Sequence, residues 1–266
     1  MKSYICYLTP ISFFKSMFIM KRVFALIVLL LLLINTGINA QLKKGIRMVG
    51  ASVGSAFFNS SQSDYSYPAP TTGYTSTGNN FGINLNPSMG WFVSDNTAIG
   101  ALLNFGYTHQ KTFAKAANGN IFNRDISNSF NMGFGGFARN YFKSSGTMMP
   151  FGQFNLNGGI GSASNKGFYF TNSDKNSYDG KSSGDFFINT GVELGFTKML
   201  NEHTGLDLFV GYTYSYNKRT YKTTTLIDLA NNGSVDQTAI SEPTLKYSNH
   251  GFMLGIGFQI FLDKRK

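Results

Sequence analysis

The sequence predicts an all-β fold, an eight-stranded antiparallel up-and-down transmembrane β-barrel. Three observations lead to this prediction. Apolar and polar residues alternate with a period of two many times after Gln41, whereas a helical period is absent there. Gly and Phe are abundant, with 30 and 26 residues, while only 14% of the chain is charged. Long polar connections also alternate with tight ones, which is typical of transmembrane barrels.

The first 40 residues differ from the rest and predict a secretory signal peptide. Two basic residues precede an apolar run of 12 residues (23–34), and Ala40 provides a small residue at the expected cleavage site. The run is shorter than the ~20 residues that a membrane-spanning helix needs. We therefore expect residues 1–40 to be a signal peptide, with an over-extended start before Met20, and residues 41–266 to be the barrel domain. An uncleaved anchor is the alternative.

Removal of the signal peptide changes the chemistry available to the chain. Cys6 is the one cysteine, so the mature chain has no thiol for disulfides, metal ligation or catalysis. The formal net charge falls from +10 to +6, because four basic and no acidic residues precede Gln41. No basic run with interleaved aromatic residues indicates a nucleic-acid site. Three scattered histidines make no metal-ligand spacing, so we expect neither a metal nor another cofactor.

The strands are expected where the alternation is found. It is clearest in 204–217, where one face is Leu, Val and Tyr and the other is polar or Gly, with Phe209 as the apolar exception. The segments 186–197 and 251–262 repeat this pattern. Weaker alternation predicts five further strands, near 46–58, 81–93, 97–109, 126–142 and 149–163. Strands of ~11 residues tilted by ~45° span roughly 25 Å, the height of the apolar band of such a barrel.

The connections predict how the barrel is oriented. Tight links are expected at 94–96, 143–147 and 200–203, and long polar links at 59–80, 110–125, 164–184 and 218–248. In bacterial barrels of this kind, short turns face the periplasm and long loops face the outside. We therefore expect short periplasmic turns, long extracellular loops and both termini in the periplasm.

The lumen face is expected to hold small residues and a few charges. Strand glycines fall on this face, and a narrow barrel needs small residues inside. By the same phase, Arg139, Glu193 and Asp207 point into the lumen, where an Arg–carboxylate network would satisfy the charges and help to fill the barrel. A charged gate is the alternative. Eight strands enclose an interior just wide enough for side chains, so we expect no wide open pore.

Aromatic and basic residues near the strand ends suit the membrane interfaces. Aromatic rings are expected at the periplasmic interface (Trp91, Phe142, Phe196 and Phe261) and at the outer interface (Tyr107, Tyr214 and Tyr216). Basic side chains near the outer rim are candidates for contacts with lipopolysaccharide phosphates, namely Lys111, Lys115, Lys166, Lys218, Arg219, Lys222 and Lys246. A solvated basic rim without a specific ligand is the alternative.

Two strand-turn-strand elements resemble a known family. The segment NPSMGWFVSDNTAIGALLNFGY from Asn86 and the segment ELGFTKMLNEHTGLDLFVGY from Glu193 are similar to the signature of the outer-membrane β-barrel domain family, the small OmpA- and OmpX-like barrels. In both, an apolar strand ends in an aromatic or hydrophobic pair and returns through a Gly-containing strand. The end of the chain, with Gly255, Phe258 and Ile260, resembles the family's signal for the barrel assembly machinery, although Met253 and the four residues after Leu262 depart from it.

The resemblance implies an integral outer-membrane protein among outer-membrane lipids and lipopolysaccharide. We expect a non-enzymatic barrel with an envelope-structural or surface-interaction role. One alternative is an accessory subunit of a secretion or assembly complex, in contact with other envelope proteins. Another is an enzyme that modifies lipid A or phospholipids, but His109 at the outer rim has no partner serine, because Ser127 and Ser129 fall on the lumen face. A soluble ligand-binding barrel would need its apolar residues inside.

Overall fold

The computed structural model describes residues 41–65, 73–171 and 174–262. The chain divides into Met1–Gly37 and Ile38–Lys266, and every described residue belongs to the second part. The expected signal peptide therefore lies outside the described residues. Among the described residues, no helix is long and apolar enough to cross a membrane.

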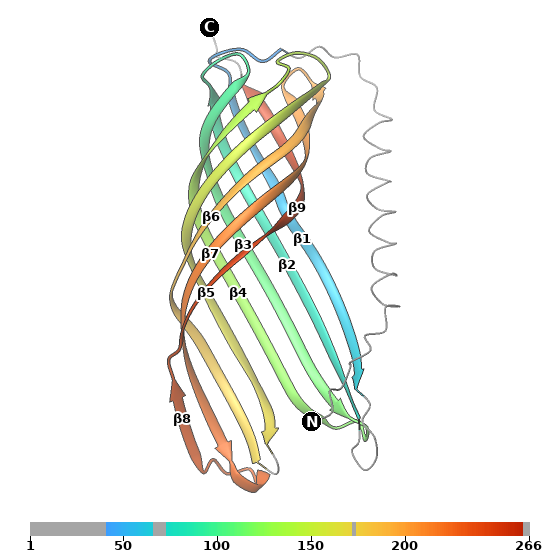
Figure 1. The fold of residues 1–266 in the computed structure, drawn as a ribbon, viewed down its shortest axis with the longest axis vertical. Helices are drawn as coiled ribbons and strands as arrows, with labels where there is room; N and C mark the ends of the chain where they lie inside the picture. Colours follow the sequence, from blue (N-terminus) through green and yellow to red (C-terminus); the bar gives the residue numbers. More distant parts are fainter. Residues whose placement is uncertain (1–40, 66–72, 172–173, 263–266) are drawn as a thin grey trace, which may run out of the picture. The chain divides into compact units, whose positions relative to one another are not determined.

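Eight strands form a closed antiparallel ring, as the sequence predicted (Figure 1). Each strand pairs with the next, and the last strand of the ring pairs with both β7 and β1. A short additional strand, β8 (Gln237–Ser241), pairs with β7 outside the ring and follows the 3-10 turn η1 (Leu229–Asn231). The ring consists of β1 (Arg47–Tyr65), β2 (Tyr74–Phe92), β3 (Thr97–Ala116), β4 (Ile121–Tyr141), β5 (Met148–Thr171), β6 (Asp174–Asn201), β7 (Thr204–Asp228) and β9 (Thr244–Leu262).

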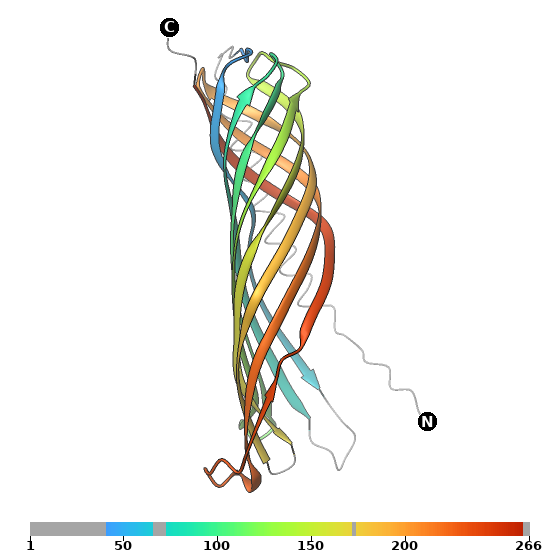
Figure 2. The same ribbon diagram turned by 90° about the vertical axis from the view of Figure 1, so that its left-hand side faces the viewer.

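The expected tight links are found at one end of the ring, which we call the short-turn end. They join β2 to β3, β4 to β5 and β6 to β7. The expected long loops are wrong in their bounds, because most of 59–80, 110–125, 164–184 and 218–248 is strand. Figure 2 shows these hairpins continuing at the opposite end, which we call the hairpin end. Backbone pairing continues there through residues that are mostly polar on both faces, so the regular apolar alternation ends before the ladder does.

The wall of the barrel has an apolar exterior and a largely polar interior. On β9, outward-facing residues from Phe252 to Leu262 are 38–84% exposed, while the intervening Gly255, Gly257, Gln259 and Phe261 are buried. The same alternation recurs on β6, where Val192 and Leu194 are exposed. Because the strand period is two, a one-residue slip would move every apolar side chain into the lumen.

Beyond the apolar band, side chains crosslink the interior of the hairpins. The Tyr178 hydroxyl on β6 donates a hydrogen bond of 2.5 Å to Asp125 Oδ1 on β4. Both residues are register partners of Gly167 on β5, which leaves room for the Tyr178 side chain to pass. Burial and the neighbouring Asp125 carboxylate raise the pKa of Tyr178.

Glycine on the lumen face makes room for Phe209, the apolar exception on the polar face of segment 204–217. Phe209 on β7 is 4% exposed and points inward. Its ring lies where a side chain at Gly255 would project, and its Cβ lies where a side chain at Gly195 would project. Phe209 therefore fills the lumen only because both neighbouring strands carry glycine at its level.

This packing predicts that Gly255→Ala destabilises the barrel by about 1–3 kcal/mol, because the added methyl group meets the Phe209 ring. The matched control is Gly251→Ala on the same strand and the same face, where an added Cβ meets nothing within 4 Å. The measurement is urea unfolding of the purified barrel, with heat-modifiable migration on gels as the readout of the folded fraction. Equal unfolding midpoints for the two variants would contradict the assigned packing of Phe209.

Candidate functional site

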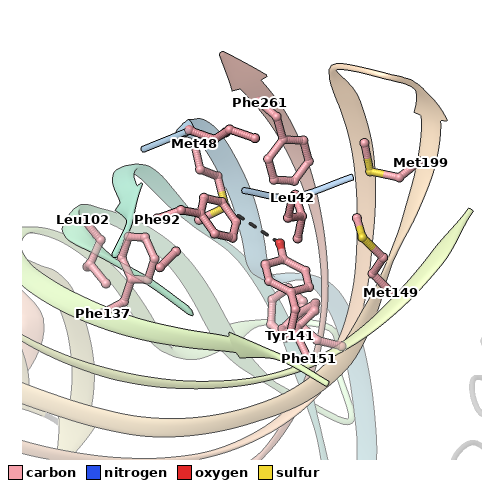
Figure 3. Close-up of a cluster of buried hydrophobic side chains, with 13 residues drawn as sticks. Leu42, Met48, Phe92, Leu102, Phe137, Tyr141, Met149, Phe151, Met199 and Phe261 are labelled. Atoms are coloured by element: carbon pink, nitrogen blue, oxygen red, sulfur yellow. Dashed lines mark hydrogen bonds between the residues drawn. The ribbon is translucent and has the colours of Figure 1, made fainter. Parts of the chain in front are cut away.

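An apolar floor closes the lumen at the short-turn end (Figure 3). Every strand of the ring contributes at least one inward-facing side chain to this floor. Tyr141, Met149, Phe151 and Met199 are fully buried at 0% exposure, and the Tyr141 hydroxyl points to Met48 Sδ at 3.8 Å. The floor comprises Leu42, Ile46, Met48, Phe92, Ala98, Leu102, Phe137, Tyr141, Met149, Phe151, Met199, Phe209 and Phe261.

The segment before β1 completes the floor from outside the ring. Leu42 N donates a 2.7 Å hydrogen bond to the carbonyl of Ser144, in the link between β4 and β5. Lys44 N donates to Asp95 Oδ1 at 2.9 Å, in the link between β2 and β3. These bonds hold residues 41–46 across the short-turn end and place Leu42 at 2% exposure. The segment therefore seals the floor beneath the strands.

A buried ion pair lies on the lumen side of the floor. Arg139 Nη1 on β4 donates to Asp207 Oδ2 on β7 at 2.7 Å, and the two side chains are 4% and 0% exposed. The guanidinium also lies 4.0 Å from the centre of the Phe151 ring. Because both charges are out of water, the pair is stable only if its remaining polar atoms are also satisfied.

Neutral side chains satisfy much of this layer, although Gln259 Oε1 is buried without a hydrogen-bond partner. Asp207 accepts hydrogen bonds from Thr197 Oγ1 at 2.5 Å and from Gln259 Nε2 at 3.0 Å. Gln153 bridges the two halves of the layer, since its Oε1 accepts from Arg139 Nε at 2.6 Å and its Nε2 donates to Glu193 Oε2 at 3.0 Å. The structure thus brings the three charges selected from the sequence into one continuous network.

Above the network, the lumen is open and lined by amides. A cavity of about 330 Å³ rests on Arg139 and Glu193. A second cavity of about 250 Å³ shares Asn84, Asn189 and Ser215 with the first and extends towards the hairpin end. Together they form a well that is closed below and polar along its walls, with asparagines at 84, 86, 104, 155, 157 and 189.

The aromatic rings expected at the interfaces lie on the outer face of the barrel, except for one. Trp91 and Phe142 near the short-turn end are 43% and 65% exposed, and Phe196 is half-buried on the outer face. The expectation for Phe261 is wrong, since it is 3% exposed and belongs to the floor. Phe261 is the next lumen-facing residue after Gln259 on β9, and it lies at the short-turn end, where the lumen is filled by apolar side chains. On the hairpin side, Tyr107 and Tyr214 are exposed and Tyr216 is half-buried.

The basic residues expected at the outer rim do not all lie on the outside. Arg219 is the exception, because it pairs with buried Asp185 at 2.7 Å and lines the upper cavity. Lys111 is half-buried, with its Nζ 5.9 Å from the Phe113 ring. Lys222 lies 3.2 Å from Glu242 in an exposed ion pair. Exposed positions on the strands above the apolar band are taken by the remaining lysines, Lys115, Lys166, Lys218 and Lys246.

The buried network predicts a large and asymmetric response to mutation. Asp207→Ala leaves Arg139 buried without its counter-ion, at a cost of about 3–5 kcal/mol in unfolding free energy, while the double variant Arg139→Met/Asp207→Leu recovers much of that loss. The control is Glu242→Ala, which breaks the exposed pair with Lys222 and costs less than about 1 kcal/mol. Urea unfolding measures all three, and a cost for Asp207→Ala no larger than for Glu242→Ala would rule out the network as a stabilising layer.

No family model and no curated protein matches the sequence. Many solved structures are similar in fold, among them three outer-membrane proteins. The outer membrane protein OprG from Pseudomonas aeruginosa is 15% identical, with a TM-score of 0.35, over 82% of this chain and 97% of its own. The outer membrane protease OmpT from Escherichia coli is 9% identical, with a TM-score of 0.45, over 84% and 96%. Neisserial surface protein A is 15% identical, with a TM-score of 0.28, over 81% and 95%.

These likenesses are to the fold alone. The closed ring, its exposed apolar exterior and its polar lumen are features of this chain itself. A ring with no free edge at its base pairs its backbone groups internally, which a spanning structure in lipid requires. The chain therefore has the fold of a transmembrane β-barrel, closed at its base, apolar outside and largely polar within.

Proposed function

We propose that this protein is a non-enzymatic barrel of the outer membrane that spans the bilayer without an open pore and contacts the envelope surface through its hairpin end. The observation that carries this proposal is the closed floor. Thirteen buried apolar residues and the Arg139–Asp207 pair fill the lumen across all eight strands. An ion crossing this layer would lose its hydration and meet no continuous polar path, which makes conduction unfavourable.

The histidine environments support a non-enzymatic role. His109 Nδ1 lies 2.7 Å from Asn128 Oδ1, and His250 Nδ1 lies 2.9 Å from the Tyr212 hydroxyl. A nucleophilic mechanism needs a serine or threonine within hydrogen-bond reach of such a base. Within the described ranges, the hydrogen bonds of the two rings go to Asn128 and Tyr212, and next to His109 the alternation turns Ser127 and Ser129 to the other face of β4.

The proposal includes an orientation and a route of assembly. We place the short-turn end in the periplasm, because short connections are typical of that side, and β1 begins and β9 ends there. Phe258 and Ile260 on β9 are exposed on the outer face, as residues read by a barrel assembly machinery need to be. The hairpin end then faces the exterior, with its polar strands in water.

The closed floor predicts that the purified protein gives no stable ionic current in planar bilayers, because eight strands leave an interior that side chains fill. The measurement is single-channel recording, with liposome swelling in small neutral solutes as a second assay. A large, steady conductance from verified folded protein would contradict the proposal.

Two lysines on adjacent strands support a contact with anionic lipid. Lys218 on β7 and Lys246 on β9 are direct register partners, and both are exposed. Like charges directly opposite each other destabilise a sheet unless an anion lies between them. The pair stands beyond the outermost exposed tyrosines of β7, at the level expected for lipopolysaccharide phosphates. This pair, rather than the whole set of basic residues, is the proposed phosphate contact.

The double variant Lys218→Gln/Lys246→Gln is expected to lower the affinity for lipopolysaccharide by roughly tenfold or more, at about 1 kcal/mol per lysine. The control is Lys43→Gln/Lys44→Gln, which removes the same charge from two exposed positions at the short-turn end. Affinity is measured by titration of the detergent-solubilised barrel with purified lipopolysaccharide. An equal loss in both double variants would show that net charge alone governs binding.

A further inference from the structure

The ring is closed between β1 and β9 over a much shorter length than between any other pair of strands. Their ladder runs through seven residue pairs, from Arg47↔Leu262 to Val53↔Ile256. β9 is paired with β7 over 17 positions, up to Thr220↔Thr244, and β1 stays paired with β2 up to Tyr65↔Tyr74. From Gly54 on β1 and Gly255 on β9, one edge of each strand therefore has no partner strand among the described residues. Figure 1 shows the two strands diverging, and we call the gap the seam.

The seam begins within the apolar band of the barrel. On β9 the exposed apolar side chains run from Leu262 to Phe252, but the ladder with β1 ends at Ile256. Four residues of the band, about 13 Å of strand at ~3.3 Å per residue, thus border the seam. The opening lies in the half of the apolar band nearer the hairpin end.

Apolar rings stand on both sides of this opening. Phe252 and Phe58 are the most exposed large hydrophobic side chains of the described residues, at 84% and 74%. On the inner face, Phe57 lies over Gly82 and remains 41% exposed. With the bulge at Gly54 allowed for, an extended ladder would place Phe58 opposite Phe252 and Phe57 opposite Met253. The seam therefore has an apolar lining on its lipid side and on its lumen side.

The well in the lumen reaches the base of the seam. Ser52 and Gly54 of β1 and Met253 of β9 line the same 330 Å³ cavity that rests on Arg139 and Glu193. Gly54 occupies the bulge and has Asn86 and Met253 as its nearest side chains. The polar well therefore borders the base of the apolar seam. Its volume is at the lower end of the ~300–1,000 Å³ typical of small-molecule sites.

The lining of the well indicates the chemistry of a ligand. Glu193 has two amide donors, Asn155 and Gln153, and no cation within ion-pair distance among the described residues. A carboxylate has about four acceptor sites, so it can accept further hydrogen bonds. The side-chain amide groups of Asn86 and Asn157 accept one hydrogen bond each and keep their N–H donors for a ligand. A hydroxyl group donates and accepts, and so it matches this mixed lining, whereas an anion would meet Glu193.

We propose that the well and the seam form one binding site for a single-chain amphiphile with an uncharged, hydroxyl-bearing head group. The head lies in the well against Glu193, Asn86 and Asn157. The alkyl chain passes out between Met253 and Phe57 and lies along Phe58 and Phe252 in the outer part of the apolar band. The proposed site depends on one part of the proposed function, the closed floor. The floor keeps the head group in the well, because it blocks the lumen at the short-turn end.

The test uses the full barrel in phosphatidylcholine nanodiscs and an alkyl glucoside that carries a photoreactive diazirine on its chain. Irradiation followed by peptide mass spectrometry maps the labelled residues. The expected result is saturable labelling of β1 and β9 beside the seam, competed by octyl glucoside and not by decyl sulfate. Phe134 on β4, 65% exposed on the outer face, is expected to label without saturation, as lipid-facing residues do.

Two variants separate the site from general contact with lipid. Asn86→Leu/Asn157→Leu removes the amides of the well and is expected to weaken saturable labelling by about tenfold or more. Asn118→Leu, in the exposed link between β3 and β4, is the control and leaves labelling unchanged. Heat-modifiable migration confirms that each variant is folded.

Even, non-saturable labelling around the whole band would overturn the proposal, and equal competition by decyl sulfate would overturn its head-group chemistry. Neither result depends on conductance. A folded barrel that conducts ions yet shows saturable labelling at the seam would contradict the closed-floor function alone, so the two failures are distinguishable.

Discussion

The seven-pair ladder between β1 and β9 is the constraint on which the rest of the structure depends. In lipid, each unpaired backbone polar group costs several kcal/mol, so a sheet becomes a spanning structure only when its first and last strands meet. The same ladder sets Met48 opposite Phe261 and so brings two halves of the apolar floor together. Without it, the floor, the ion pair above it and the well would have no enclosing wall.

The polarity of the lumen changes along its length, from an apolar floor through a buried ion pair to an amide-lined well, and each layer sets the solvent exposure of the next. The apolar floor excludes water from the short-turn end, and it thereby desolvates Arg139 and Asp207 at its upper surface. The attraction between the two charges is strong in that setting, but removing them from water is costly. Hydrogen bonds from Thr197 and Gln259 to Asp207, and from Arg139 to Gln153, offset part of that cost. Only above this layer is the interior roomy, and there asparagines line much of the wall, up to the Arg219–Asp185 pair in the upper cavity.

The strand number and the inward direction of Arg139, Glu193 and Asp207 could be predicted because period-two alternation assigns each residue to a face. The hairpin ends could not, since Ser, Asn and Thr on both faces leave no apolar signal there while backbone pairing continues. The floor was missed for a related reason. The alternation assigns Trp91 to the membrane interface but makes no assignment for the adjacent Phe92, which the structure buries in the lumen while Trp91 is exposed on the outer face. Gln153 and Gln259 carried no signal, because polar residues are expected on any lumen face.

The segment that seals the floor also determines when the barrel can be finished. Arg47 and Leu262 are 215 positions apart in the chain, yet they pair directly (47 to 262). Leu42 docks only after the link near Ser144 has formed, and it lies just before the strand that must find β9. Folding rates fall as contacts become more distant in sequence, because loop closure precedes their stabilising contribution. The pairing of the first and last strands therefore spans a very large separation along the sequence, and before it forms the sheet has two free edges.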